Sequence, residues 1–538
     1  MRCLPALTTA GALVGVLLLG ATPGQAGTAS RFGPTTALPP HPGLGLKHNS
    51  DAEPGMGVTP DGRIWIASDV DPGTADPRVG GGALSGTDVW SSTDNGRTFQ
   101  FAADPFGSTS STPGLGGEDA DIAVAPDRGP GDAYNVYAAS LWVGSTSIAM
   151  SQDNGKTWTL IPVDGAPVQD REWLAADGPC TLYVGYHQTG TQLPLVTTID
   201  ACSPGNTFSA SALDPTDAQR FLAGGPPFET NLIGKLVVDT HPGSPYRHRI
   251  YYPMEQCLFS DLAADPVGFE SSSVGCTGKA ELFLGVSSDG GKTFTDVHVA
   301  TSPHSELSIW PSTMGVDGAG NVYYAWHDNR HSFLDVSHDG GLHWSAPVQV
   351  DRGAAVYPTV AAGQAGRVDV LYVGTGKAGN SNDRKVFGKP GAVDSDPWRI
   401  YDARSTDGGR SFSTQLVSDV VHRGALCTQG SGCSSDGSRD FLDDFGAVIS
   451  PRTGLLSTVF SSDQPTGKRA NNFTAFATEL PATTVRPPVS SPPTVTPRPA
   501  TGSGALAATG AAPALMTLGL ALLLATAGWR RARLPRRG

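Results

Sequence analysis

The sequence has few basic residues for its length. Its 538 residues include 37 Lys and Arg against 50 Asp and Glu, a formal net charge of −13. Eight of the arginines lie at the two ends of the chain, so the part between them keeps 29 basic residues (37 less eight) and all 50 acidic ones, a charge of −21. A body of this charge repels polyphosphate, which argues against nucleic acid as a partner and favours calcium, cationic ligands or neutral glycans.

The sequence also lacks the closely spaced cysteine pairs of structural zinc sites. None of its seven cysteines stands in a CxxC pair, so metal binding by cysteine is the lesser alternative. Cys3 falls in a predicted secretion signal, residues 1–26, which would be removed, and no cysteine stands at the cleavage point to carry a lipid anchor. In an exported chain the even number that remains predicts three disulfides, paired most simply in sequence order. The six residues are Cys180, Cys202, Cys257, Cys276, Cys427 and Cys433.

The composition changes after Leu480. Residues 481–505 are rich in Pro, Thr and Ser and predict an extended stalk. Residues 506–538 contain the pentapeptide LAATG, an uncharged apolar stretch at 511–529 that is long enough to span a bilayer, and five arginines. This order resembles a cell-wall sorting signal of the LAxTG type, which opens here at Leu506. The resemblance implies that a sortase cuts between Thr509 and Gly510 and joins the chain to the cell wall, and a single-pass membrane anchor is the alternative.

One eight-residue phrase occurs five times, for example as STDNGRTF from Ser92 and SSDGGKTF from Ser287. In each copy the acid can accept hydrogen bonds from the amides of a tight turn, a glycine can adopt a positive φ, and an aromatic residue begins the next strand. The phrase resembles the Asp-box, or bacterial neuraminidase repeat, of sialidases and related β-propellers. The resemblance implies that the boxes lie at the blade perimeter and are structural, and their aspartates are Asp94, Asp153, Asp289, Asp339 and Asp407.

The spacing of the boxes and a second repeat predict the number of blades. Successive box aspartates are 59, 136, 50 and 68 residues apart, and one blade takes about 40 to 50 residues. The long gap therefore hides a blade whose box has decayed, and residues 197–208, with Asp200 in the place of the box acid, fit it. Seven apolar hairpins, the first near residue 53 and the last near residue 439, predict an all-β propeller of seven blades over residues 45–480. Six blades, the usual count in sialidases, is the alternative, and the outer strand near residues 471–480 is expected to pair with the N-terminal part of the chain.

In a propeller the ligand binds over the central channel, where the starts of the innermost strands meet. Carboxylates that converge there can hold a hard cation or divide into the acid and base of a glycosidase, although each can also have only a structural role. The catalytic candidates are Glu118, Asp119, Glu172, Glu229, Asp443 and Asp444. The ligand-binding candidates are Glu53, Arg171, Trp310, Trp326, Arg330, Tyr357, Arg399 and Arg439.

The catalytic residues of sialidases are harder to find than the scaffold. The resemblance implies three arginines that clamp a sugar carboxylate, a Tyr nucleophile activated by Glu, and an Asp acid/base. The R-I-P tripeptide that carries the first arginine in that family does not occur in this sequence, and HRIYYP at residues 248–253 is the nearest fragment. Tyr251, Tyr252 and Tyr357 are the candidate nucleophiles.

Three functions fit these observations. The first is a monomeric, surface-displayed propeller that binds a glycan or other extracellular ligand at its mouth and requires no cofactor. The second is a glycoside hydrolase that uses a pair of the acids at the mouth. The third is a structural wall protein stiffened by calcium (Ca2+) at the same acids.

Overall fold

The computed structural model describes most of the expected propeller. The described residues are 31–42, 51–70, 87–107, 118–142, 145–161, 163, 169–188, 193–203, 207–213, 230–257, 281–302, 313–428, 438, 445–464 and 472–481. The expected secretion signal, most of the stalk and the sorting signal with Leu506, Thr509 and Gly510 lie outside them. In these ranges, no helix combines the length and the apolar composition needed to cross a membrane.

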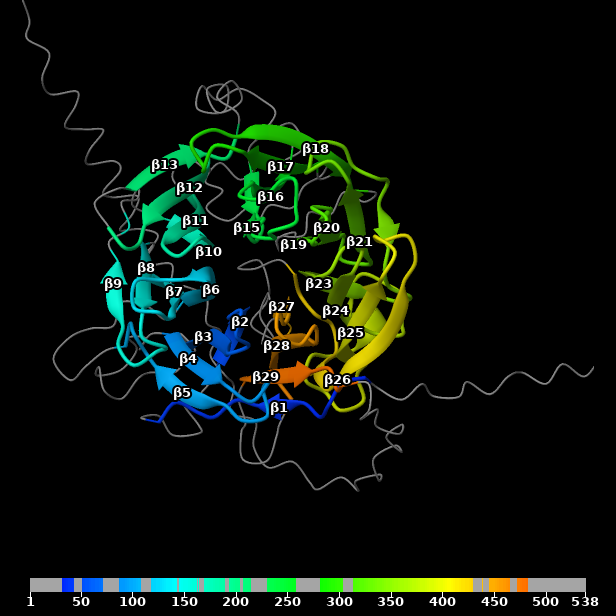
Figure 1. Ribbon diagram of the computed structural model, residues 1–538. Helices are drawn as coiled ribbons and strands as arrows, with labels where there is room; N and C mark the ends of the chain where they lie inside the picture. The colour runs from blue at the N-terminus through cyan, green and yellow to red at the C-terminus, as the bar shows by residue number, and fades with distance from the viewer. Residues whose placement is uncertain are drawn as a thin grey trace, which may run out of the picture.

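The described strands form seven antiparallel sheets arranged radially around one axis (Figure 1). Blade 1 consists of β2 (Asp51–Val58), β3 (Ile64–Val70), β4 (Thr87–Ser92) and β5 (Gln100–Ala103). Blade 2 consists of β6 (Glu118–Arg128), β7 (Tyr134–Trp142), β8 (Ser145–Ser151) and β9 (Thr159–Ile161). Blade 3 consists of β10 (Gln169–Asp177), β11 (Thr181–Gln188), β12 (Leu193–Asp200) and β13 (Thr207–Ser211). Within each blade the chain runs from the axis to the edge, so the first strand lines the channel.

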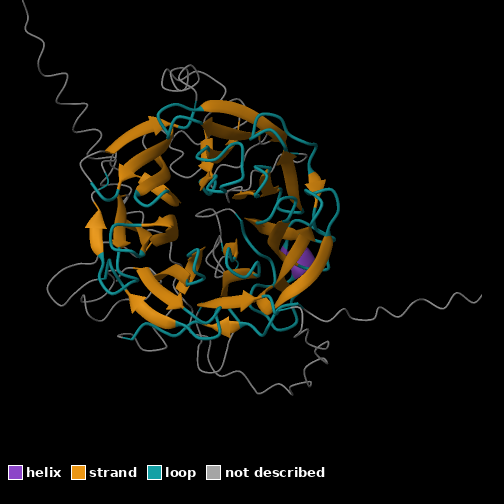
Figure 2. Ribbon diagram, in the orientation of Figure 1, coloured by secondary structure: helices purple, strands orange, loops and turns teal. Residues whose placement is uncertain are grey.

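Blades 4 to 6 follow the same plan. Blade 4 consists of β14 (Thr230–Ile233) and β15 (Val237–Val238), which both pair with β16 (Ile250–Cys257), followed by β17 (Glu281–Ser287) and β18 (Thr295–Thr301). Blade 5 consists of β19 (Thr313–Val316), β20 (Val322–His327), β21 (Ser332–Ser337) and β22 (Val348–Gln349). Blade 6 consists of β23 (Ala355–Ala362), β24 (Val368–Gly374), β25 (Pro397–Ser405) and β26 (Ser413–Arg423). A single helical turn, α2 (Arg384–Phe387), lies in the connection between β24 and β25 (Figure 2).

The seventh blade joins the two ends of the described chain. It contains β27 (Gly446–Ile449), β28 (Leu456–Ser462) and β29 (Phe473–Thr478), and its outermost strand is β1 (Thr36–Ala37), which pairs with β29. The prediction of seven blades is confirmed, and so is the pairing of the last unit with the N-terminal part of the chain. In detail, β29 is the third strand rather than the outer one, so the blades take in residues before residue 45, where the sequence had suggested the start of the domain.

Buried ion pairs join the seventh blade to the sixth. Glu479 lies just after β29, and its carboxylate is 2.7 Å from Arg404 Nη1 and 3.2 Å from Arg367 Nη2 of blade 6. It also accepts a hydrogen bond from the Leu456 amide (2.9 Å). Desolvation raises the pKa of Glu479, but the hydrogen bond from Arg404 and the other donors outweigh it and lower the pKa overall. The carboxylate therefore stays ionised and holds the last blade to the one before it.

The hydrophobic core is divided among the contacts between blades. The described buried side chains form seven clusters, and each combines residues of two neighbouring blades. At the contact of blades 1 and 2, for example, the Trp65 and Trp158 rings pack edge to face with centroids 6.2 Å apart. Because every blade buries both faces, its strands are rich in β-branched and aromatic residues.

The five boxes all form the turn between the third and fourth strands, at the edge of the ring. In blade 4, Asp289 accepts hydrogen bonds from the Ser287 hydroxyl (2.8 Å), the amides of Lys292 (3.1 Å) and Thr293 (3.0 Å), and the Thr293 hydroxyl (2.6 Å). Equivalent bonds surround the other four box acids, Asp94, Asp153, Asp339 and Asp407. Each acid thus closes its own turn.

These hydrogen bonds keep the box acids ionised. Slight desolvation raises the pKa of Asp94 and of Asp289, but hydrogen bonds from Thr98 and from Thr293 outweigh it and lower each pKa to about 2. The pKa is also lowered in the other three boxes, at Asp153, Asp339 and Asp407. A charge-assisted hydrogen bond is stronger than a neutral one, so ionisation strengthens the turn.

The box glycine lies against the preceding blade. A Cβ atom on Gly96 (φ +78°) would come within 2.1 Å of Phe476 in blade 7, and one on Gly155 (φ +84°) within 2.5 Å of Trp65 in blade 1. The equivalent glycines of blades 4, 5 and 6 also approach side chains of the blade before them. Glycine is therefore required both for its positive φ and for the close approach, and each box fastens its blade to the previous one.

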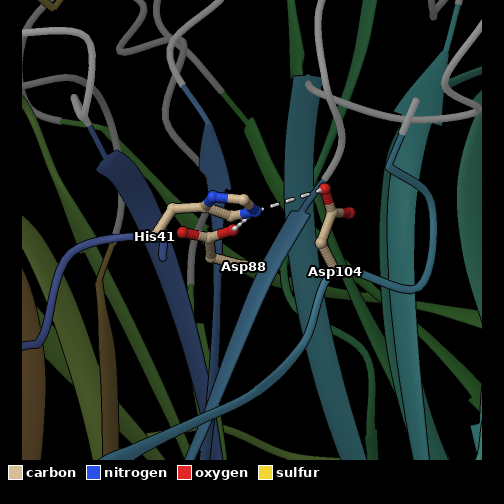
Figure 3. A group of neighbouring side chains, drawn as sticks. All are labelled: His41, Asp88 and Asp104. Carbon is tan, nitrogen blue, oxygen red and sulfur yellow. Dashed lines mark ion pairs between the residues drawn. The ribbon is translucent and has the colours of Figure 1, made fainter. Parts of the chain in front are cut away.

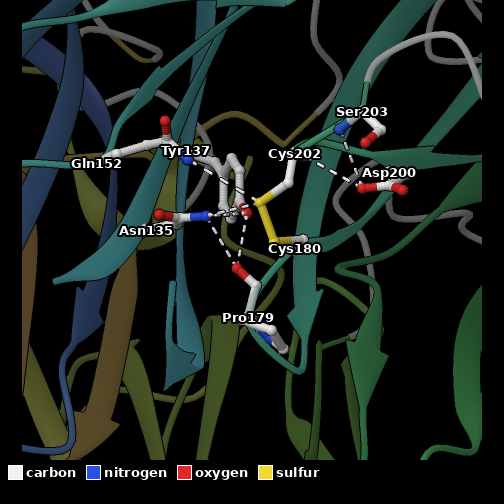
Figure 4. Close-up of a disulfide and its surroundings, with 8 residues drawn as sticks. All are labelled: Asn135, Tyr137, Gln152, Pro179, Cys180, Asp200, Cys202 and Ser203. Atoms are coloured by element: carbon white, nitrogen blue, oxygen red, sulfur yellow. Dashed lines mark hydrogen bonds between the residues drawn. A yellow bond between two sulfur atoms is a disulfide. The ribbon is translucent and has the colours of Figure 1, made fainter. Parts of the chain in front are cut away.

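The third blade has a disulfide where its box has decayed. Asp200 still accepts a hydrogen bond from the Cys202 amide (3.2 Å) in the turn between β12 and β13. Cys202 is bonded to Cys180, in the turn between β10 and β11 (Figure 4). Asn135 of blade 2 donates to the carbonyl oxygen of Pro179 (2.8 Å), so the bridged turns also contact the preceding blade. A covalent link and this hydrogen bond take the place of the box contact.

The cysteines can be followed only in part. The bond between Cys180 and Cys202 is the pairing expected from sequence order. Cys427 is also disulfide-bonded. Cys257 ends β16, while Cys276 and Cys433 lie outside the described residues.

Candidate functional site

The two faces of the ring carry different connections. The box turns and the turns between first and second strands share one face. On the other face, where the inner strands begin, the connections include long ones such as residues 258–280 between β16 and β17 and residues 424–445 between β26 and β27. Longer connections carry binding functions more often than tight turns do. A binding site is therefore expected on this second face, which is called the mouth.

Three inner strands share an unusual backbone feature at the mouth. Glu53 of β2, Arg171 of β10 and Tyr357 of β23 have φ angles of 46°, 59° and 53°. Each lies at a bulge where the register with the second strand of its blade shifts. A residue other than glycine in such a conformation costs about 1–3 kcal/mol, and strain of this kind gathers at functional sites. Because a bulge also redirects its side chain, the three positions mark the mouth as the candidate site.

Arg171 lies between two acids that come from the two preceding blades. Its Nη1 atom is 3.8 Å from Glu53 Oε1 and 3.5 Å from Asp119 Oδ1. Since both acids approach the same nitrogen, these oxygens are at most 7.3 Å apart, the sum of the two distances. The side chains of Arg171 and Asp119 are 14% and 20% exposed, so the cluster is reachable from solvent. Three successive blades thus contribute one charged side chain each.

A second charged layer lies one step further along the inner strands. Lys235, between β14 and β15, places its Nζ atom 2.8 Å from Asp121 Oδ1 and 5.1 Å from the centre of the Trp173 ring. The other oxygen of Asp121 accepts a hydrogen bond from the Leu174 amide (2.8 Å). The ion pair and the cation–π contact balance the fully buried Asp121 carboxylate and join blades 2, 3 and 4 beneath the Arg171 cluster.

Blades 5 and 6, across the ring, bring two neutral side chains together. The Tyr357 hydroxyl donates to the carbonyl oxygen of Cys427 (3.0 Å), and its ring packs edge-on against His327 with centroids 5.6 Å apart. Burial lowers the pKa of His327 to about 3, so its imidazole is uncharged. The ring accepts a hydrogen bond from the Asn329 amide (3.3 Å). The turn after β20, at the same face, also contains charged groups, the buried Asp328 and the half-buried Arg330.

Three of the ligand-binding candidates lie apart from the Arg171 cluster. Trp326 is 1% exposed, and its Nε1 donates to Asp335 (2.7 Å) in the core. Burial raises the pKa of Asp335 to about 7. Arg330 is half-buried in the turn after β20, and Arg399 is half-buried in β25, the third strand of its blade. Trp326 thus offers no exposed face on which a sugar could stack.

Other candidates are only partly placed. Glu118 begins β6, and Glu172, 2% exposed, follows Arg171 in the bulge of β10. The remaining candidates lie outside the described residues and stay predictions: Glu229, Trp310, Arg439, Asp443 and Asp444.

Two of the three candidate tyrosine nucleophiles, Tyr251 and Tyr252, are not activated. Tyr251 and Tyr252 are fully buried in β16, and burial raises the pKa of both hydroxyls above the usual value. A nucleophile needs the opposite shift or a neighbouring base. Among the arginines that the structure describes, Arg171 stands at the start of an inner strand beside Glu53 and Asp119, whereas Arg330 and Arg399 lie on blades 5 and 6.

Sequence reasoning missed two groups of residues. Lys235 and its partner Asp121 carry no motif, because they meet only through the curvature of the ring. His41, Asp88 and Asp104 gather at the outer strands of blade 1 and are not part of any motif recognised in the sequence. A repeat of acids at alternate positions of β6, Asp119 and Asp121, was the one available signal for the layered charges.

Comparisons with known proteins find solved structures that are similar only at low sequence identity. No protein-family model matches the chain, and no curated protein matches its sequence. Similar solved structures include the NanB sialidase of Streptococcus pneumoniae (10% identity, 83% of this chain and 70% of that one, TM-score 0.38) and YCF48 of Cyanidioschyzon merolae (12%, 83% and 99%, TM-score 0.39). An ulvan lyase, a polysaccharide lyase, is also similar (12%, 68% and 80%, TM-score 0.40). These likenesses concern the fold alone: the chain is an all-β, seven-bladed propeller whose structural neighbours include sialidases.

Proposed function

We propose that this protein binds a neutral glycan at the mouth of its propeller, through Glu53, Asp119 and Arg171. The observation that carries the proposal is the meeting of three charged side chains from three successive blades, two of them on strained bulges. Strain at equivalent positions is retained only where the surrounding structure holds it, and a binding site is a common reason.

The mixture of charges favours a neutral, hydroxyl-rich ligand. A sugar hydroxyl both donates and accepts hydrogen bonds, which matches carboxylate acceptors beside guanidinium donors. An anionic ligand would meet Glu53 and Asp119, and a cation would meet Arg171. No metal is needed at this place, because Arg171 and Lys235 already balance acids there.

A glycan array followed by calorimetry with the purified protein tests the proposal. Arg171→Ala should weaken binding of the best glycan about tenfold to a hundredfold, since a hydrogen bond to a charged group contributes about 1.5–3 kcal/mol. Arg97→Ala, an exposed arginine in the box turn of blade 1, is the matched control and should bind as the wild type does. A blank array, or equal loss in both variants, would overturn the proposal.

Glycoside hydrolysis is the second candidate, and one distance favours it. The carboxyl oxygens of Glu53 and Asp119 are at most 7.3 Å apart, and glycosidase carboxyl pairs are about 5 to 9.5 Å apart. Arg171 counts against it, because a guanidinium between two acids favours the ionised form of both, whereas a glycosidase needs one of them protonated. Sugar release from an array glycan that Asp119→Asn abolishes would place hydrolysis first.

We also propose that the protein is a monomer exported and held at the cell surface. The support is in the sequence alone: a secretion signal at residues 1–26, and a pentapeptide with Leu506, Thr509 and Gly510 before an apolar stretch and a basic tail. A sortase and the cell wall would then be its partners, and the membrane would hold it before processing. Fractionation of producing cells tests this, and recovery only from the cytoplasm would contradict it.

A further inference from the structure

A second polar cluster lies at the outer part of blade 1, away from the channel. It consists of His41, Asp88 and Asp104 (Figure 3). Nε2 of His41 is 3.8 Å from Asp88 Oδ1 and 3.9 Å from Asp104 Oδ2. One nitrogen or oxygen atom from each residue lies within 4.8 Å of the other two. A nitrogen and two oxygens therefore face a common point.

Three separate segments bring these side chains together. Asp88 is the second residue of β4, and Asp104 follows β5, the next strand. His41 comes from the segment that leaves β1 and crosses from blade 7 to blade 1. Residues that are distant in the sequence thus converge through the closure of the ring, which explains why no motif announces them.

The histidine is held in place by its surroundings. Its ring packs edge to face on Phe101 of β5, with centroids 5.0 Å apart. Two residues before it, the carbonyl oxygen of Pro39 accepts a hydrogen bond from Trp90 Nε1 (2.8 Å). The crossing segment is therefore fixed on blade 1 at Pro39 and through the His41 ring, and the imidazole is positioned before any ligand arrives.

Asp104 is also oriented. Its Oδ1 accepts hydrogen bonds from the amides of Thr87 (3.2 Å) and Phe106 (3.3 Å). Its Oδ2 is the oxygen that lies toward His41. Amide donors that hold one oxygen of a carboxylate and direct the other are a familiar support for a metal ligand.

The three side chains of the cluster are buried. Asp88 is 0% exposed and His41 7%, and the Asp104 side chain is 7% exposed. Two buried carboxylates so close to one another repel, and a divalent cation between them would relieve that repulsion.

We propose that His41, Asp88 and Asp104 bind a divalent transition metal ion, with zinc as the best fit. One imidazole and two carboxylates suit zinc and its neighbours, whereas calcium and magnesium prefer oxygen alone. Ligand atoms about 2.0–2.2 Å from zinc at tetrahedral angles are about 3.4 Å apart. The two distances from His41, 3.8 and 3.9 Å, need a small contraction, and the two acids, which lie within 4.8 Å of each other, need one of at most 1.4 Å (4.8 less 3.4). Three protein ligands leave a fourth position for water.

The metal would act on the seam of the ring. His41 belongs to the segment that begins with β1, and both acids belong to blade 1. A metal bound by all three would therefore tie blade 7's outermost strand to blade 1 and stabilise the closed ring.

Zinc binding to the full chain tests this inference. After removal of metal with a chelator and dialysis, wild-type protein should take up one zinc ion per chain and melt at a higher temperature with zinc than without. Cobalt should give a visible absorption band that reports a nitrogen and oxygen environment. His41→Gln should lose the band and weaken zinc binding at least tenfold, whereas His343→Gln, an exposed box histidine, should leave both unchanged.

A pair of variants at Asp104 guards against a simple failure to fold. Asp104→Asn should lose zinc binding, while Asp104→His, which supplies a different metal-binding atom, should retain it. A wild-type chain that takes up no zinc, or a His41→Gln chain with unchanged zinc affinity and cobalt spectrum, would overturn the inference. Glycan binding concerns the mouth and is measured in a separate experiment, so its outcome does not bear on the zinc site.

Discussion

The edge of the ring and its mouth differ in how closely their blades resemble one another. At the edge, five blades repeat the same aspartate turn and the same contact of a glycine with the preceding blade. At the mouth, equivalent bulges carry Glu53, Arg171 and Tyr357, three residues with different chemistry. A contact that every blade needs is repeated, whereas a site that must recognise one ligand is made of unlike parts. Repetition therefore marks stability, and its absence marks function.

The most direct way to break the edge is to fill the space at a box glycine. Gly96→Ala should lower the free energy of unfolding by about 2–4 kcal/mol, because it adds left-handed strain and overlap with the Phe476 ring. Denaturant unfolding measures this effect. Binding at the mouth of the folded fraction should be unchanged.

A control substitution at Gly290, in the box turn of blade 4, separates backbone strain from overlap with the preceding blade. Gly290 has a similar φ of +77°, but a Cβ atom there would meet nothing within 4 Å. Gly290→Ala should therefore cost only about 1 kcal/mol. Equal losses in the two variants would show that the contact with the preceding blade contributes nothing.

Acid should weaken the edge in a defined range of pH. The pKa of Asp94 and of Asp289 is lowered to about 2 in the folded protein, against about 4 in an unfolded chain. A lowered pKa contributes stability that is complete above pH 4 and is lost as the pH falls toward 2. Melting temperatures between pH 5 and pH 2 measure it, and the slope should be shallower in Asp289→Asn. A flat profile would contradict the structural role of these charges.

A substitution at the mouth should weaken ligand binding and leave the stability of the protein nearly unchanged. Glu53→Gly relieves the positive φ of 46° but removes a partner of Arg171, so the free energy of unfolding should stay within about 1 kcal/mol of wild type. Glycan binding should fall about tenfold. Glu53→Ala keeps the strain and should be less stable than Glu53→Gly by about 1 kcal/mol. If Glu53→Gly were the less stable of the two, the bulge would not be strained.

The scaffold could be predicted because its information is local and repeated. Each box carries its hydroxyl, acid, glycine and aromatic residue within eight positions, and the decayed copy at Asp200 still forms its turn. What local sequence could not show is the surface against which a box packs, such as Phe476 under Gly96, because that residue comes from another blade. The pairing of the N-terminal part of the chain with the last blade was predicted, but the sequence did not show that Thr36–Ala37 form the strand, because only the pairing with β29 identifies it.

The site could be predicted only as a region. The starts of the inner strands were expected to converge, and Arg171 does lie against Glu53 and Asp119. The positive φ angles had no sequence signal, because Glu, Arg and Tyr are not residues that favour them. Trp326 was predicted to stack on a sugar, but its neighbours Phe333 and Asp335 enclose it in the core. Such outcomes depend on which face of a strand meets the next blade, which spacing along the chain does not reveal.

The strand order of the seventh sheet has a consequence for biosynthesis. A ribosome makes Thr36 among the first residues, yet its partner Phe476 appears only after six complete sheets have been translated. Six sheets can form in order as the polypeptide emerges, while β1 waits without a neighbour. The last sheet can be completed only when both extremities are present together. A premature stop late in translation would therefore leave β1, which was synthesised at the beginning, without its partner strand β29.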